Sequence, residues 1–137
     1  MRIEPETVPR PALVAFRDRT ELAWLRVLRP GFRHCAVWVR VGEFWIGEEC
    51  LSHRTVLSCV PAEQGGTLET ALRRGGARVL RTFVRAAPRR LAPPLPFTCV
   101  EAAKRALGIH AWRIVTPYQL YRHLIRTRRT SLLTMIL

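Results

Sequence analysis

One cysteine of this chain stands where a helix is predicted to begin. In residues 98–101, Thr98 is followed three residues later by Glu101, which is the pattern of a capping box. Good helix formers continue to Leu107, and Gly108 supplies a stop. Cys99 is therefore expected at the first helical position, where unpaired N–H groups and the helix dipole favour a thiolate over a thiol. The negative charge of Glu101, one turn further on, opposes that effect.

A histidine far upstream is a candidate partner for this thiol. His34 stands near the start of an alternating segment, residues 33–41, which predicts a β-strand. The alternation places Cys35, Val37, Val39 and Val41 on one face, expected to be the core face. His34 and the small Ala36 share the other face, where a helix N-terminus has room to approach. An imidazole beside a thiol forms a base–nucleophile pair of the kind that cleaves acyl compounds.

The two motifs together resemble the circularly permuted branch of the papain-like superfamily, which contains cell-wall peptidases and the lecithin:retinol acyltransferase relatives. In that branch a histidine opens a β-meander, and the nucleophilic cysteine comes later, at a helix start. The resemblance covers residues 31–126. Its matching pieces are residues 34–39 with the Gly42 turn, residues 98–101, and the Thr-Pro-led segment 116–120. It implies that Cys99 is the nucleophile and His34 the general base of a peptidase or amidase acting on peptidoglycan peptide.

The third residue of the site departs from the family pattern. In the family a polar side chain on the next strand orients the imidazole. Within the next predicted strand, residues 44–50, the expected spacing falls at Ile46 or Gly47, and Glu48 is the best substitute. Without a polar group there the tautomer of His34 is not fixed and catalysis is weakened. A papain-like shell that has lost its chemistry and serves as a structural part therefore stays open as an alternative.

The remaining patterns predict an α+β fold, in which a small antiparallel sheet forms a β-meander packed against helices. Further strands are expected at 54–60, 77–84 and 112–115, and helices at 18–29, 67–74 and from Thr116 onward. Because Pro5, Pro9 and Pro11 interrupt the start, residues 1–16 are interpreted as an extended arm. Residues 17–126 then form one domain. The Arg-rich stretch 126–129 is expected to end the last helix and release an apolar tail, residues 127–137.

Composition limits the class of protein. The chain has 137 residues and a formal net charge of +13, carried almost wholly by arginine, since Lys104 is the only lysine. Such a field attracts nucleic acid, anionic polymers or acidic proteins. No nucleic-acid-reading motif is present, so nucleic-acid binding is expected to be weak and non-specific. No apolar leader segment or membrane-spanning run is visible, and no motif calls for a cofactor.

Cysteine spacing gives little support to a metal site. The four cysteines, at 35, 50, 59 and 99, include no Cys-x-x-Cys pair. A zinc ion held by His34, Cys35, Cys50, His53 and Cys59 is the weaker alternative.

Three functions follow as expectations. The first is a cysteine hydrolase on peptidoglycan peptide, and the second is an inactive structural component on the same fold. A compact, Arg-rich chain without a signal peptide that resembles a wall peptidase suits a bacteriophage or gene-transfer-agent tail. The expected location is thus the virion, or the bacterial cytoplasm before assembly, with other tail proteins as partners. The third function is Arg-driven nucleic-acid binding.

Overall fold

The computed structural model describes residues 9–19, 27–62, 65–92, 94 and 98–136. Within these ranges the chain forms five strands and three helices. In chain order they are β1 (Arg10–Arg17), β2 (His34–Val41), β3 (Phe44–Cys50), β4 (Thr55–Pro61), α1 (Gly65–Arg74), β5 (Arg78–Val84), α2 (Cys99–Leu107) and α3 (Pro117–Ile136). The fold is α+β, as the sequence predicted.

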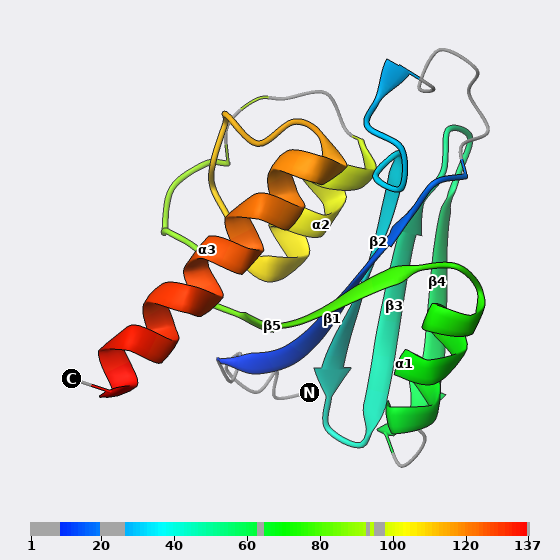
Figure 1. Cartoon of the computed structure of the whole chain (residues 1–137), viewed down its shortest axis with the longest axis horizontal. Helices are drawn as coiled ribbons and strands as arrows, with labels where there is room; N and C mark the ends of the chain where they lie inside the picture. The colour runs from blue at the N-terminus through cyan, green and yellow to red at the C-terminus, as the bar shows by residue number, and fades with distance from the viewer. Residues whose placement is uncertain (1–8, 20–26, 63–64, 93, 95–97, 137) are drawn as a thin grey trace, which may run out of the picture.

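All five strands belong to one antiparallel sheet with the order β4-β3-β2-β1-β5. Helices α2 and α3 cover one face of this sheet and α1 covers the other, as Figure 1 shows. None of the helices in the described part of the chain is long and apolar enough to span a membrane.

Each face of the sheet carries its own core. Alternate residues of β1 contribute to the two cores. Val14 and Phe16 belong to the cluster that α2 and α3 cover, whereas Leu13 and Ala15 belong to the cluster that α1 covers. The first cluster also contains Cys35 and Val37 of β2, with Val100, Ala103 and Leu107 of α2, and Leu120 and Leu124 of α3. This packing fixes α2, and with it Cys99, over β2.

The expected N-terminal arm is wrong for the residues that the structure describes. Residues 10–17 form β1, which lies between β2 and β5, and Ala12 to Phe16 are at most 3% exposed. Pro11 is tolerated because it pairs only with Phe83 of β5, while the ladder to β2 begins at Ala12. The missing proline N–H therefore falls one residue beyond the end of the ladder with β2, so it breaks no pair of that ladder.

The expected C-terminal tail is also wrong, because α3 continues without a break through the Arg-rich stretch to Ile136. Arginine is a good helix former, so a run of arginines does not end a helix. The distal half of α3 projects beyond the sheet (Figure 1), and Leu132, Leu133, Met135 and Ile136 are exposed. Residues 112–115 form a turn followed by irregular backbone and not the expected strand. Most of the expected helix 18–29 lies outside the described residues.

Candidate active site

Helix α2 begins as the sequence predicted, with Cys99 as its first residue and Thr98 as its N-cap. The Thr98 hydroxyl accepts a hydrogen bond from the backbone N–H of Glu101 at 3.3 Å. At the other end Gly108 adopts the left-handed conformation, with φ of 76°, and closes the helix. The Cys99 thiol therefore lies at the positive end of the helix dipole.

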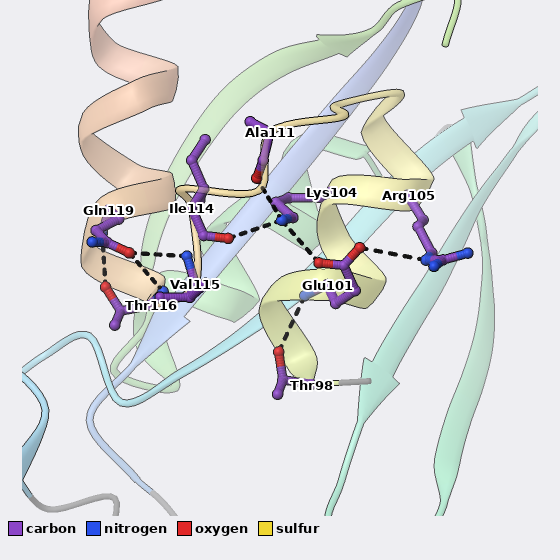
Figure 2. A network of polar contacts seen from close by, with 9 residues as sticks. All are labelled: Thr98, Glu101, Lys104, Arg105, Ala111, Ile114, Val115, Thr116 and Gln119. Carbon is purple, nitrogen blue, oxygen red and sulfur yellow. Dashed lines mark hydrogen bonds and ion pairs between the residues drawn. The ribbon is translucent and has the colours of Figure 1, made fainter. Parts of the chain in front are cut away.

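The Glu101 carboxylate does not reach back to Thr98 as a full capping box requires. It forms ion pairs with Lys104 at 2.8 Å and with Arg105 at 3.5 Å, as Figure 2 shows. Glu101 and Lys104 are both buried, at 4% and 1% exposed. The cation beside Glu101 offsets the negative charge that was expected to disfavour a Cys99 thiolate.

Lys104 also ties α2 to the connection that leads into α3. Its ammonium donates to the backbone carbonyls of Ala111 at 2.8 Å and Ile114 at 2.9 Å, in addition to Glu101 (Figure 2). An ammonium has three N–H donors, so all three find an acceptor. Lys104, the only lysine of the chain, is therefore a buried side chain that links the cysteine-bearing helix to the connection before α3.

His34 is the first residue of β2, and its Nε2 lies 2.9 Å from Oε1 of Glu49 on β3. The carboxylate that reaches the imidazole is thus that of Glu49, and the expectation that Glu48 plays this part is wrong. The difference follows from the strand register, in which Glu48 lies opposite Val37. Glu48 therefore shares the face of Val37 and Cys35. It is the next residue, Glu49, whose carboxylate reaches His34 at the end of β2.

Cys99 and His34 are brought together although they are far apart in the sequence. The Cys99 thiol interacts with the imidazole of His34 and with the side chain and backbone of Cys35. Because Nε2 of His34 faces Glu49, Nδ1 is the ring nitrogen left for the thiol. Cysteine, imidazole and carboxylate therefore follow one another in the order of a catalytic triad.

The surroundings of Cys99 lower its pKa to about 5. The hydrogen bond from the Cys35 thiol is the largest cause; burial opposes it, and the hydrogen bond and charge of His34 add to it. For His34, burial lowers the pKa, but the Cys99 thiolate and the Glu49 carboxylate outweigh burial and raise the pKa above its ordinary value. From about pH 5 up to the raised pKa of His34, the site is a thiolate–imidazolium pair.

Cys35 is the site residue that sequence reasoning missed. It is buried, and its hydrogen bond to Cys99, together with burial, raises the pKa of Cys35 well above the ordinary value, so it stays a protonated donor. Helix α2 packs on the face of β2 that carries Cys35 and Val37, and not on the Ala36 face as expected. The adjacency of Cys35 to His34 was the available signal, but strand alternation had assigned it to the core alone.

The structure does not assemble the zinc alternative. Within the described ranges no three or more His, Cys, Asp or Glu side chains are grouped as a metal ion requires. Cys59 is exposed on β4, whereas Cys35 is buried under α2. Two hollows stand out on the described surface, and neither is lined by Cys99 or His34.

Comparison with protein-family models, with curated proteins and with solved structures finds no significant match to this chain.

Proposed function

We propose that this protein is a cysteine hydrolase that cleaves an amide bond through a Cys99 acyl-enzyme. The observation that carries the proposal is the contact of a low-pKa thiol at a helix N-terminus with an imidazole, itself bonded to a carboxylate. In the family that the sequence resembles, this order of residues belongs to papain-like cell-wall peptidases. We therefore propose a permuted papain-like domain, with peptidoglycan peptide as the substrate class.

The residues divide the reaction as follows. The Cys99 thiolate attacks the carbonyl carbon, and the C–N bond breaks as the leaving amine takes a proton from the His34 imidazolium. Neutral His34 then removes a proton from water, which attacks the thioester and releases the acid and the Cys99 thiolate. Glu49 stabilises the imidazolium and holds the ring in one orientation. Cys35 donates to the thiolate in the resting site.

The test is hydrolysis of purified peptidoglycan, measured as new free amino groups. Wild-type protein should release them, and Cys99→Ser and His34→Ala should not. Cys59→Ser is the matched control, because Cys59 is an exposed thiol on β4, and it should keep full activity. Equal release by the wild type and Cys99→Ser would refute the proposal.

A second candidate function is a non-enzymatic part of a virion tail on the same fold. The observation that favours it is the projecting end of α3, where Leu133, Met135 and Ile136 are 63%, 86% and 80% exposed. Apolar side chains gathered at the end of a helix suit contacts with other tail proteins. If this role is the only one, Cys99→Ala protein supports particle assembly as well as the wild type, and protein lacking residues 132–137 does not.

A further inference from the structure

A hollow of about 220 Å³ lies beside α3, on residues that the proposed hydrolase does not use. Its lining comes from the connection before α3 and from one face of the helix: Arg113, Ile114, Gln119, Arg122, His123 and Arg126. The four α3 residues follow the i, i+3, i+4, i+7 spacing that places side chains on one face of a helix.

Hydrogen-bond donors dominate this lining. Three of its six residues carry guanidinium groups, and none is Asp or Glu. Gln119 turns its acceptor away, because its Oε1 accepts from the backbone N–H groups of Val115 at 2.9 Å and Thr116 at 3.1 Å, as drawn in Figure 2. This contact leaves the side-chain NH₂, which can only donate.

The charges around the hollow repel one another. Arg122 and Arg126 lie one turn apart on α3, where like charges destabilise a helix. Burial and the charge of Arg126 lower the pKa of His123, so the imidazole avoids adding a further positive charge. No carboxylate of the described residues forms an ion pair with Arg113, Arg122 or Arg126. An anion would relieve this repulsion.

We propose that this hollow binds a phosphate group, free or as a small phosphate monoester. Three planar guanidinium forks match the several acceptor oxygens of a tetrahedral phosphate, and each pair of N–H groups can bind two of them. A carboxylate has only two oxygens and one charge, and it cannot engage three guanidinium groups equally well. The site is independent of Cys99, so its failure would not affect the hydrolase, nor the reverse.

The test is an NMR titration of the folded chain with sodium phosphate, in which sodium chloride keeps the ionic strength constant. We expect saturable shifts of the amides of residues 113–126 and of the His123 ring, whose pKa should rise when the anion binds. Arg122→Gln and Arg126→Gln should each weaken binding about tenfold, as the loss of one charge-assisted contact implies. Glycerol 3-phosphate in a parallel titration shows whether the monoester binds more tightly than free phosphate; tighter binding of either one supports the site.

The matched control is Arg89→Gln, which removes the same charge from an exposed loop position outside the hollow. It should bind phosphate as the wild type does. Loss of binding in Arg89→Gln equal to that in Arg122→Gln would reduce the effect to net charge and overturn the proposal. Acetate binding as strong as phosphate binding would overturn the choice of ligand. Tighter binding of oligothymidylate that survives Arg122→Gln and Arg126→Gln would assign the basic surface to nucleic acid instead.

Discussion

At the scale of single residues, the exposed thiol of this chain is not the one whose pKa is lowered. Cys59 is exposed, whereas Cys99 is only partly accessible, yet the pKa of Cys99 is lowered to about 5. An ordinary free cysteine titrates near pH 8.5, so at pH 6 its thiolate fraction is about 300 times smaller than that of a thiol with a pKa of 5. The weaker intrinsic nucleophilicity of a low-pKa thiolate cancels about fortyfold of this advantage.

We therefore predict that iodoacetamide alkylates Cys99 roughly tenfold faster than Cys59 at pH 6, and that the order reverses at pH 9. Mass-spectrometric mapping of the two cysteines over a pH series measures both rates. In His34→Ala the midpoint of the Cys99 profile should move to higher pH, because the imidazolium that favours the thiolate is gone. A Cys99 rate that follows that of Cys59 at every pH would contradict the lowered pKa.

The adjacent carboxylates Glu48 and Glu49 offer a matched pair of variants. Only Glu49 contacts His34, and it raises the pKa of that residue. We predict that Glu49→Gln lowers the pKa of His34 and reduces hydrolysis about tenfold or more, because the imidazolium loses its stabilising charge. Glu48→Gln should change neither quantity. NMR titration of the His34 ring measures the pKa, and equal effects of the two variants would contradict a specific role for Glu49.

At the scale of elements, the buried pair between Glu101 and Lys104 holds α2 in place. Lys104→Met removes the cation and leaves a carboxylate that is 4% exposed without its closest partner. Breaking a buried pair in this way typically costs about 3–5 kcal/mol. We predict a loss of this size in the free energy of unfolding, measured by urea denaturation.

Two further variants separate the pair from its surroundings. The double variant Glu101→Gln/Lys104→Met should recover part of the loss, because no buried charge is then left uncompensated. Arg105→Gln should cost less than about 1 kcal/mol, since Arg105 is half-exposed and lies 3.5 Å from Glu101. A Lys104→Met protein as stable as Arg105→Gln would show that the buried pair does not stabilise α2.

The elements also show which features local sequence could predict. The start and end of α2 follow from Thr98 and Gly108, which act on their own helix, and both were predicted correctly. Strand β1 was not predicted, because prolines at 5, 9 and 11 argue against a strand. The apolar run 12–16, however, is typical of a strand buried on both faces. Glu49 depends on register: the two-residue turn at 42–43 pairs Val41 with Phe44 and then Val37 with Glu48. Counting along that ladder places Glu48 on the face of Val37 and so favours Glu49 as the carboxylate beside the end of β2.

The contact between Cys99 and Cys35 cannot be predicted by counting residues along a strand ladder. It depends on which face of the sheet α2 covers, and that choice is made by the packing of α2 and α3 together over β1 and β2. Neither the alternation in β2 nor the cap of α2 contains this information. The pKa of the candidate nucleophile is therefore a property of the tertiary structure, although the residues that set it stand at recognisable positions in the sequence.

At the scale of the whole molecule, the chain divides into a packed body and a projecting helix end. Residues 132–136 of α3 are all exposed, whereas Leu120 on the same helix is completely buried. Among the described residues, the hydrogen bond from Arg85 to the Ser131 hydroxyl, at 3.4 Å, is the most C-terminal side-chain hydrogen bond between α3 and the body. The projecting end therefore contributes little to the stability of the body.

We predict that deletion of residues 132–137 changes the free energy of unfolding by no more than about 0.5 kcal/mol, as for surface positions in general. Leu120→Ala is the control on the same helix, and it should cost about 2–5 kcal/mol, because it opens a cavity in the core. Urea denaturation of both variants beside the wild type decides the matter. If the deletion destabilised the protein as much as Leu120→Ala, the end of α3 would belong to the core of the domain, and the proposal that it serves contacts with other tail proteins would lose its structural basis.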